Sequence, residues 1–540
     1  MWILIGAGKP QWTVFRHNGP FFPPKYEAHK TPIIYQGREI VLPELAEEYI
    51  TLYAKYIGTE YTDNPRFNKN FFYDLKKVLP NELKEAKLED IDMSKIQDYH
   101  QVESEKKKNM TKEEKDELKK NNNEIEEPYK YCVIDGAKQK VGNYKIEPPG
   151  IFLGRGDHPK SGMIKRRIKP EDITLNLDKE APIPKINIDS KDEMKWGKII
   201  HDNSVIWLAT WKDDITGKNK YIFTSMESIF KSKSDESKFD LAKKLKRKAN
   251  KIRDQYENQL NSDENKVRQL ATALYFIDHL ALRVGGKKDK KEQADTVGVT
   301  SLRVEHISLA PPNIVKLDFL AKDSVRFCKK INVTKPVFDN LIMFINSKNR
   351  KDQLFDLISA SSINQYLDDF MEGLTAKVWR TYNASTIFQK ELDKINEEKV
   401  LSIHESDRIN YLLNMFNQAN TTVALLCNHQ KKVSSTLDEQ IEKLEQKIKE
   451  LKKKKKKYLE NKKKELAEKT DSKLKLYKLK KESKLKMKNV SLGTSKMNYI
   501  DPRIIFAFMK KFNIPEDKLF TSALLSRFEW ASSVDKDYRF

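Results

Sequence analysis

Five short stretches of the sequence carry side chains that can handle a phosphate group. Each contains an arginine, lysine, histidine or tyrosine, and the stretches are Leu280–Gly285, Phe319–Ser324, Lys377–Asn383, Leu426–Gln430 and Ser495–Arg503. Breaking a phosphodiester without a metal ion needs a nucleophile, positive charge on the non-bridging oxygens and a proton for the leaving oxygen. Side chains of these four types can supply all three.

Each of these side chains taken alone has a more ordinary interpretation. A lone tyrosine in an apolar helix is usually a core residue, a lone arginine is usually a surface charge, and a buried histidine usually has its hydrogen bonds satisfied. Glu305-His306 is expected to be structural, because the nine histidines do not cluster with carboxylates at metal-ligand spacing. Tyr538 lacks the Ser-Lys-x-Asn-Tyr setting of Tyr499, so we assign it no chemistry.

The charge balance of the 540 residues favours a polyanionic partner. Lysine and arginine total 102 against 79 aspartate and glutamate, which leaves a net charge of +23. Of this excess, +13 falls within residues 431–490 and +10 on the rest of the chain. Such an excess favours nucleic acid before a membrane surface. No run approaches the roughly 18 apolar residues that span a bilayer, so an integral membrane protein is excluded.

Two other site classes are disfavoured. The three cysteines, Cys132, Cys328 and Cys427, lie far apart without a CxxC pair, which argues against a disulfide framework or a zinc site and favours a reducing compartment. The segment Gly6–Lys9 lacks the spacing and the following Ser or Thr of a P-loop, so an ATP-driven nucleic-acid motor is disfavoured as well.

A mixture of strands and helices has to position the five stretches. The patterns predict a strand over Tyr131–Ile134 that enters a turn, a β-hairpin over Val205–Phe223, and a small sheet over Ser301–Lys329. A hairpin tip at Ala321–Asp323 places a lysine at the end of that sheet. The segment Glu103–Glu127 is almost entirely charged or polar, which predicts a solvated helix or connector.

Helices are predicted over most of residues 229–430. One apolar stripe at spacings of three and four covers residues 241–260, and Ser262 is predicted to cap the next helix. That helix is expected to end at Arg283–Gly286, where a glycine can take the left-handed conformation of a helix C-terminus.

A lysine-rich coiled coil is predicted to follow. Its apolar positions are Leu437, Ile441, Leu444, Ile448 and Leu451, in a heptad pattern. The run Lys452–Lys457 repels itself, so we expect a marginally stable, mobile element. A helical hairpin would turn at Asn461 or at Thr470-Asp471, and the sequence leaves both open. Beyond it the composition is globular again, around Ile504, Phe506, Phe508, Leu519, Phe528 and Trp530.

Taken in order, the five stretches closely resemble the eukaryotic type IB DNA topoisomerases. Ile146–Gly150, Gly154–Lys160 and Ser301–His306 add to the resemblance, which extends from about Lys9 to Phe540. Several separated motifs in the same order are specific, whereas any one of them alone would be weak.

The resemblance implies an α+β multidomain fold that closes around DNA as a bilobed clamp. Residues 1–228 would form a mixed cap and DNA-binding lobe, and residues 229–432 a mostly helical catalytic core like that of the tyrosine recombinases. Residues 433–488 would form an antiparallel coiled-coil linker, and residues 489–540 a small helical C-terminal domain that carries the nucleophilic tyrosine.

The implied activity is relaxation of positive and negative supercoils by transient cleavage of one strand, rotation and religation, without ATP, metal or cofactor. By resemblance, Tyr499 is the nucleophile and forms a 3′-phosphotyrosyl link. Arg283 and Arg380 would clamp the phosphoryl oxygens, His429 would donate a third hydrogen bond, and Lys322 would be the general acid for the 5′-oxygen.

The resemblance also implies contacts outside these five residues. Arg155, Lys220, Asp323 and Asn498 would contact DNA around the cleavage point, and Arg155, Asp323 and Asn498 match the family's camptothecin pocket, which predicts sensitivity to that class of inhibitor. Lys160 and Glu292 have opposite charges at positions matching the two lips of the clamp and would form its latch.

The expected partner is double-stranded DNA, bound largely without sequence preference by a monomer that does not associate with membranes. Chromatin and the replication and transcription machinery are further candidate partners, and the expected location is the nucleus. The long charged N-terminal arm usual in the family is nearly absent, so nuclear entry would rest on Lys243–Lys248 or Lys452–Lys457.

One departure from the family affects the site. After the catalytic arginine the family usually reads Ala-Gly-Asn-Glu, whereas this chain reads Val284-Gly285-Gly286-Lys287, so Lys287 and Lys288 would have to replace a phosphate contact from the asparagine.

Two rival functions stay open at this point. A tyrosine site-specific recombinase would use the same residue types, and a non-enzymatic chromatin-binding protein would use the lysine-rich coil.

Overall fold

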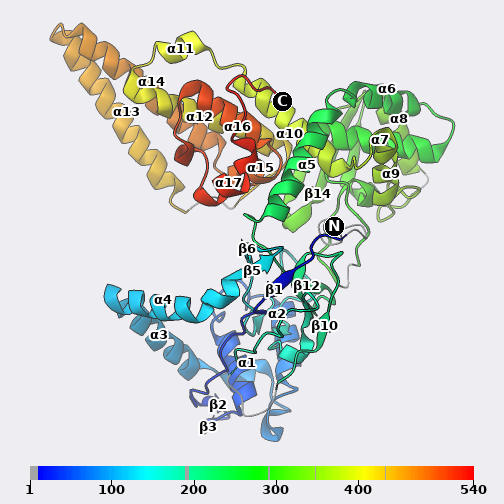
Figure 1. Ribbon diagram of the computed structural model, residues 1–540, viewed down its shortest axis with the longest axis vertical. Coiled ribbons are helices and arrows are strands. Elements are labelled where there is room, and N and C mark those ends of the chain that lie inside the picture. The colour runs from blue at the N-terminus through cyan, green and yellow to red at the C-terminus, as the bar shows by residue number, and fades with distance from the viewer. Residues whose placement is uncertain (1–9, 189–193, 290–291, 347, 432, 434) are drawn as a thin grey trace. The chain divides into compact units, whose positions relative to one another are not determined.

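The computed structural model describes residues 10–188, 194–289, 292–346, 348–431, 433 and 435–540 (Figure 1). The segment Gly6–Lys9 lies outside these residues. The chain divides into two compact units, of which the first runs to Lys231 and also includes Lys288–Asp295, and the second comprises Ser232–Lys287 and Thr296–Phe540. The fold is mixed α+β. No helix in the described ranges is both long and apolar enough to cross a membrane.

The first unit contains several small sheets. Its antiparallel sheet of β2 (Ile33–Tyr35), β3 (Arg38–Ile40) and β4 (Ile91–Asp92) shares an apolar core with α1 (Glu44–Ala54) and α2 (Pro65–Leu75). Asn64 caps α2 and Pro65 occupies its first turn, which suits proline because the missing N–H has no helical partner there. Phe67 and Phe71 on α2 are fully buried.

Two predicted strand features of this unit are confirmed. The strand β5 (Tyr131–Ile134) pairs with β1 (Phe15–His17) and β6 (Ala137–Lys140), and the turn between β5 and β6 uses positive φ angles of 47° at Asp135 and 81° at Gly136. The predicted hairpin forms from β11 (Trp207–Lys212) and β12 (Asn219–Phe223), in a sheet with β9 (Thr174–Asn176) and β10 (Lys198–Ile200). The strands β7 (Gly150–Ile151) and β8 (Ile164–Lys165) form a separate pair.

The polar segment of the first unit forms two solvated helices, as predicted. They are α3 (Ser94–Asn109) and α4 (Lys112–Glu126), and α4 buries none of its side chains. Thr111 and Glu114 form a capping box at the start of α4, which stabilises a helix that has no core face.

The second unit is mostly helical around one small sheet. Its helices before the linker are α5 (Ile229–Leu245, which begins in the first unit), α6 (Ala249–Gln259), α7 (Asn265–Leu280), α8 (Lys335–Asn346), α9 (Ala360–Phe370), α10 (Ala376–Leu392), α11 (Glu397–Leu401) and α12 (Glu405–Leu426). The predicted sheet forms from β13 (Ile307–Ala310), β14 (Ile314–Leu320) and β15 (Arg326–Asn332), all antiparallel. The lysine predicted at a hairpin tip lies between β14 and β15.

The predicted apolar stripe over residues 241–260 packs into the core, but it is divided between α5 and α6, because residues 246–248 form tighter turns with bonds to the third preceding carbonyl. Two predicted helix ends are wrong. Ser262 is not the cap of α7, whose N-cap is Glu264. That helix ends at Leu280 and not at Arg283–Gly286, since Ala281 itself takes the left-handed conformation.

The predicted coiled coil is a hairpin of α13 (Leu437–Glu460) and α14 (Lys464–Lys486), which lie side by side in Figure 1. The turn falls at Asn461–Lys463, and the helix continues through Lys452–Lys457. A small apolar cluster holds the pair together, made of Ile448, Leu451, Leu474 and Tyr477. Ion pairs join Lys455 to Asp471 and Lys481 to Glu445, so opposite charges relieve part of the lysine repulsion.

The C-terminal residues pack into the core of the second unit. They form α15 (Leu492–Asn498), α16 (Pro502–Phe512) and α17 (Ser522–Arg527). Of the apolar residues predicted here, Ile504, Phe506, Phe508, Leu519 and Phe528 are buried, and Trp530 is partly buried. They belong to the same apolar cluster as α7, α10 and α12. Residues 489–540 therefore pack with α10, which carries Arg380, and with the helices that precede Arg283 and His429.

Candidate active site

Four of the five predicted phosphate-handling stretches line one cleft in the second unit, whereas no residue of the fifth, Ser495–Arg503, is in its lining. The cleft has a volume of about 120 Å³, and its lining includes Arg283, Lys322, Asp323, Arg380, His429 and Thr494. These side chains come from the segment after α7, the β14–β15 tip, α10, the end of α12 and α15. The two arginines, the lysine and the histidine therefore share one site.

Arg380 is fixed on α10 by two backbone carbonyls. Its side chain is buried, its Nη1 donates to the carbonyl of Ala281 at 2.6 Å, and its Nη2 donates to the carbonyl of Cys427. The left-handed turn at Ala281 is what presents the first of these carbonyls. Arg380 Nε is buried and has no hydrogen-bond partner among the described residues. An unpaired buried donor costs about 1–3 kcal/mol, so a ligand oxygen at Nε would be stabilising.

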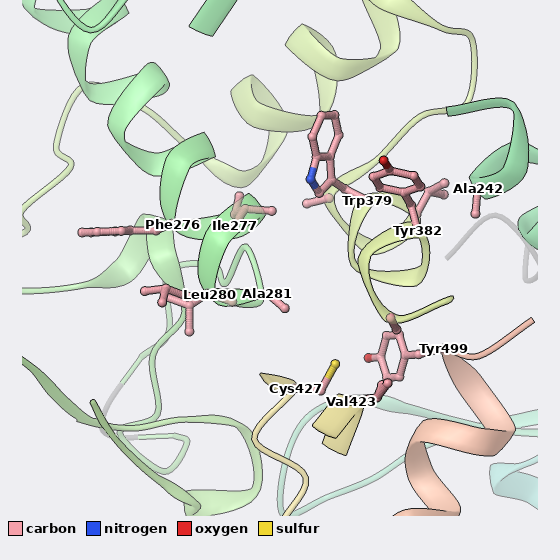
Figure 2. Close-up of a cluster of buried hydrophobic side chains, with 14 of the residues drawn as sticks. Ala242, Phe276, Ile277, Leu280, Ala281, Trp379, Tyr382, Val423, Cys427 and Tyr499 are labelled. Atoms are coloured by element: carbon pink, nitrogen blue, oxygen red, sulfur yellow. The ribbon is translucent and has the colours of Figure 1, made fainter. Parts of the chain in front are cut away.

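Tyr499 packs against both Arg380 and His429. The Arg380 guanidinium carbon lies 5.0 Å from the centroid of the Tyr499 ring, and the His429 and Tyr499 rings stack with centroids 5.3 Å apart. Tyr499 is only 5% exposed. Figure 2 shows its ring beside Val423 and Cys427. The predicted nucleophile thus lies in contact range of two of the predicted phosphate-binding side chains.

His429 is placed by the C-terminal end of α12. The helix ends at Leu426, Asn428 takes a positive φ of 54°, and His429 N donates back to the carbonyl of Ala424 at 2.8 Å. Burial, followed by the positive charges of Arg380 and Arg283, lowers the pKa of His429 to about 3. The imidazole is therefore neutral at physiological pH.

The neutral imidazole is oriented by a serine. His429 Nδ1 lies 3.0 Å from the hydroxyl of Ser495 on α15, whereas His429 Nε2 is buried without a partner among the described residues. A neutral imidazole carries one N–H. When the Ser495 hydroxyl donates to Nδ1, that N–H resides on Nε2 and is available to a ligand oxygen.

Lys322 projects from the tip of the β14–β15 hairpin. Its side chain is exposed, and the next two residues turn the chain with positive φ angles of 67° at Asp323 and 58° at Ser324. The hairpin is braced by Arg326, which forms a bidentate pair with Asp318 at 2.8 and 2.7 Å. The carbonyl of Arg326 accepts from the side-chain amides of Asn428 and Gln430, which connects the Lys322 hairpin to the His429 loop.

Arg283 lies beyond the end of α7, partly buried at the edge of the same cleft. Its carbonyl accepts from Val299 N, and the carbonyl of Val284 accepts from Thr300 N, so two chain segments run side by side there. Gly285 and Gly298 allow this approach, because a Cβ on Gly298 would lie 2.5 Å from the Cα of Gly285.

The predicted DNA contacts divide between the units. Asp323 lines the cleft, and Asn498 ends α15 directly before Tyr499, so the structure brings these two residues to the candidate site. Arg155 and Lys220 belong to the first unit, where Arg155 is exposed and Lys220 Nζ lies 3.7 Å from a carboxylate oxygen of Asp213. Their contact with DNA stays a prediction.

The predicted latch residues form an ion pair. Lys160 Nζ contacts the carboxylate of Glu292 and also donates to the carbonyl of Ile215 at 2.6 Å. All three residues belong to the first unit, because the segment Lys288–Asp295 clusters with it. The pairing agrees with the predicted contact, while its role as a clamp latch stays a prediction.

Sequence reasoning misses the residues that hold the site together. Ser495 lies in one of the five stretches, but nothing there assigns it the contact that its hydroxyl makes with His429. Ser385 lies outside those stretches, yet its hydroxyl donates to the carbonyl of Tyr499 at 3.1 Å. The spacing of four between Ser495 and Tyr499 is the available signal for the first, and nothing in the sequence marks the second. Within the described residues, no group of three or more His, Cys, Asp or Glu side chains is placed to hold a metal ion.

Comparisons with known proteins cover almost the whole chain. Three family models match: "Eukaryotic DNA topoisomerase I, DNA binding fragment" over residues 10–224, "Eukaryotic DNA topoisomerase I, catalytic core" over residues 227–462, and "C-terminal topoisomerase domain" over residues 471–540. Human DNA topoisomerase 1 is 40% identical over 98% of this chain and 72% of its own length. DNA topoisomerase 1 of Caenorhabditis elegans is 42% identical over 98% of this chain and 68% of its own. The mitochondrial DNA topoisomerase I of Rattus norvegicus is 39% identical over 100% of this chain and 94% of its own.

Proposed function

The chain belongs to the eukaryotic type IB DNA topoisomerase family, and from that premise we propose how this DNA-binding isomerase acts. It relaxes positive and negative supercoils by cutting one strand through a 3′-phosphotyrosyl intermediate at Tyr499, letting the duplex rotate, and resealing the strand. Neither ATP nor a metal ion takes part, because the link to tyrosine retains the energy of the phosphodiester bond and the site's own cations stabilise the reacting phosphate.

One observation carries the proposal. Arg380 Nε and His429 Nε2 are both buried without a partner among the described residues, and both side chains pack against Tyr499. Buried polar groups are nearly always hydrogen-bonded in native proteins, so two such donors in one cleft favour an anionic ligand that supplies oxygens to both. A phosphodiester held by these two donors would lie beside the Tyr499 ring, which both side chains contact.

In the cleavage step, the Tyr499 oxygen attacks the phosphorus while the bond to the 5′-oxygen breaks. Arg380, Arg283 and neutral His429 donate to the non-bridging oxygens, which carry more negative charge in the transition state than in the ground state. Water or the site accepts the tyrosine proton. Religation reverses these events, so the 5′-hydroxyl attacks and Tyr499 leaves.

Lys322 supplies the proton that the leaving 5′-oxygen needs. Its position on an exposed hairpin tip that lines the cleft supports this role, because the side chain can enter a DNA groove without displacing other elements. The bonds from Asn428 and Gln430 to the hairpin support a fixed distance between Lys322 and the His429 loop. General acid catalysis of this kind typically contributes about 10²–10⁴-fold.

We assign the rest of the clamp as follows. Residues 1–228 and 229–432 act as the two lobes, residues 433–488 as the linker and residues 489–540 as the domain that carries the nucleophile. Lys160 and Glu292 latch the clamp, and a partly exposed pair of this kind contributes about 1 kcal/mol, which suits a gate that must open. Arg155, Lys220, Asp323 and Asn498 contact DNA, and the enzyme is sensitive to camptothecin.

The proposed partners and cellular location of the enzyme follow from its positive charge. Chromatin and the replication and transcription machinery are its proposed partners, and it acts as a monomer in the nucleus, with the basic runs at residues 243–248 and 452–457 available for import.

The test is relaxation of supercoiled plasmid by the purified protein in EDTA without ATP. We expect full relaxation by the wild-type protein and none by Tyr499→Phe, which keeps the ring that packs on Arg380 but lacks the nucleophilic oxygen. Tyr538→Phe is the matched control and is expected to relax plasmid normally. Full relaxation by Tyr499→Phe would contradict the proposal. Strand exchange between two duplexes would instead indicate a recombinase, and binding without relaxation a chromatin protein.

A further inference from the structure

Three consecutive backbone carbonyls at the predicted nucleophile are each covered by a side chain from a different helix. Within Met497–Tyr499, the first carbonyl accepts from Arg527 Nη2 on α17 at 3.1 Å, and the second from Lys238 Nζ on α5 at 3.2 Å. The third accepts from the hydroxyl of Ser385 on α10 at 3.1 Å. Three separate parts of the second unit therefore converge on the backbone of Tyr499.

These carbonyls lie where helix α15 ends. The last carbonyls of a helix have no intrahelical partner, and they attract cations because the helix dipole is negative at that end. The helix has only seven residues, so by itself it would be marginal. The three external donors thus supply much of what keeps the nucleophile's backbone in one conformation.

Asp235 on α5 holds two of the three donors. Its Oδ2 accepts from Arg527 Nε at 2.7 Å, and its Oδ1 accepts from Lys238 Nζ at 3.1 Å. The Asp235 and Arg527 side chains are 1% and 3% exposed, so neither charge has bulk water as an alternative partner. Removing one member of such a buried pair leaves the other uncompensated, which makes the donors depend on Asp235.

We propose that Asp235, acting through Arg527 and Lys238, is a positioning residue that sets where the Tyr499 hydroxyl lies. This inference rests on the proposed function of Tyr499 as the nucleophile. With the backbone fixed at three successive carbonyls, only the side-chain torsions of Tyr499 remain to place its oxygen. The same oxygen attacks in cleavage and leaves in religation. The rates of both steps therefore depend on the contacts that Asp235, Arg527 and Lys238 make, whereas the equilibrium between cleavage and religation does not.

The test measures single-turnover cleavage of a duplex oligonucleotide that loses a short 5′-hydroxyl fragment, so that the covalent product accumulates. For Asp235→Asn we expect the rate constant at saturating DNA to fall by about ten- to a hundredfold, the range that a displacement near 1 Å produces. The fraction of protein that reacts should stay near the wild-type value. Religation of an added 5′-hydroxyl strand should slow by a similar factor.

A purely structural role gives a different result. If Asp235 only maintains the fold, the reacting fraction falls while the surviving molecules react at the wild-type rate, and that result would overturn the inference. Asp74→Asn is the matched control, because it also breaks a buried aspartate's pair with a lysine three residues on, but within the first unit. It is expected to leave the rate constant unchanged.

Lys238→Met is a second variant that tests the positioning role if Asp235→Asn does not fold. It removes the donor to the Asn498 carbonyl and leaves the Asp235–Arg527 pair intact, so a smaller fall in the same rate constant is expected, and an unchanged rate constant would contradict the inference. Failure of the inference is distinct from failure of the proposed function. If the wild-type protein forms no covalent product, the function is wrong; if it does and Tyr499→Phe does not, a wild-type rate for Asp235→Asn overturns the positioning role alone.

Discussion

At the scale of single residues, the cleft combines neutral and charged donors in a specific way. Burial of His429, followed by the positive charges of Arg380 and Arg283, lowers its pKa and keeps the imidazole neutral. A neutral donor adds a hydrogen bond to a bound phosphate without the cost of a third buried charge. The arginines supply positive charge to a bound phosphate, and the neutral histidine supplies one directional hydrogen bond.

The lowered pKa of His429 has a consequence for stability. In the unfolded chain a histidine titrates near pH 6.5, whereas in the folded protein the pKa of His429 is about 3. The unfolded state therefore binds more protons between these values, and the stability present above pH 6.5 is lost as the pH falls. At pH 5 the loss from this one group is about 2 kcal/mol. Chemical denaturation at pH 7.5 and pH 5 should show it.

The comparison that isolates this effect is between wild type and His429→Gln. The pKa of His17 is also lowered, to about 4, but that histidine is present in both proteins and cancels in the difference. We expect the free energy of unfolding of His429→Gln to fall less between pH 7.5 and pH 5. If both proteins lost the same free energy of unfolding between pH 7.5 and pH 5, His429 would have to be protonated in the folded protein at pH 5.

A second residue-scale prediction concerns Lys322. Replacing it with alanine should lower the single-turnover cleavage rate by at least about 10²-fold, because no other proton donor is proposed for the 5′-oxygen. DNA affinity, measured by anisotropy with the uncleaving Tyr499→Phe protein as background, should change little. Lys316→Ala on the neighbouring strand β14 is the control. Equal loss of affinity and rate in Lys322→Ala would reduce this lysine to a contact residue.

At the scale of elements, the candidate site is built mainly from residues at the ends of helices and at a hairpin tip. The left-handed turn at Ala281 ends α7 and presents a carbonyl to Arg380, and the positive φ of Asn428 turns the chain so that His429 enters the cleft. The helix α15 ends at the nucleophile. Each predicted catalytic side chain thus lies just beyond a helix terminus or at a hairpin tip, where backbone groups are available to fix it, except Arg380, which lies within α10.

The close approach of Gly285 and Gly298 gives a prediction at this scale. In Gly298→Ala the new Cβ would lie 2.5 Å from Gly285 Cα and 2.7 Å from the carbonyl oxygen of Arg283, so the backbone must move. Overpacking of this kind costs about 1–3 kcal/mol. Because the displaced segment carries Arg283, we expect both a lower melting temperature and slower cleavage.

Gly286→Ala provides the matched control. A Cβ on Gly286 meets nothing within 4 Å, and its φ lies outside the left-handed region, so stability should be unchanged or slightly raised. If Gly286→Ala were as destabilising as Gly298→Ala, the close approach of the two segments would not be the cause.

At the scale of the whole molecule, the charge is separated from the chemistry. Residues 431–490 carry +13 of the net charge of +23, and most of them belong to the α13–α14 hairpin. None of the described residues in this range lines the cleft. Phosphate contacts dominate the affinity of most DNA-binding proteins and weaken with added salt. This charge suits the proposed linker to bind or guide DNA, whereas the cleft is where we propose that the strand is cut.

This separation predicts a specific salt dependence. Changing Lys452–Lys457 to glutamine should weaken DNA binding at about 150 mM salt and flatten the plot of log affinity against log salt. The slope should change by about 0.9 for each phosphate that the variant no longer neutralises. The single-turnover cleavage rate at saturating DNA should not change. A slower chemical step in this variant would show that the linker also acts on the catalytic cleft.

Much of the fold and of the arrangement of the candidate site could be predicted from the sequence, and the error at the end of α7 shows why the rest could not. The β5–β6 turn, the β11–β12 hairpin and the β14–β15 tip are predictable because alternating apolar residues and turn residues are local signals. The predicted end of α7 falls too late because the glycines Gly285 and Gly286 give a strong local signal, whereas the structure uses Ala281 to meet Arg380. Local propensity is overridden by a hydrogen bond to a residue ninety-nine positions away.

The sequence alone determined which side chains are available and how charge is distributed along the chain. Arginine, lysine, histidine and tyrosine can be identified by type, and their order identifies the family. Only the tertiary structure decided what holds them. The carbonyls of Ala281 and Cys427 accept from Arg380, and the Ser495 hydroxyl contacts His429. Asp235 holds the donors that contact the backbone next to Tyr499. The physical reason is that every residue carries the same carbonyl group, so no residue type marks the one that will accept a distant donor.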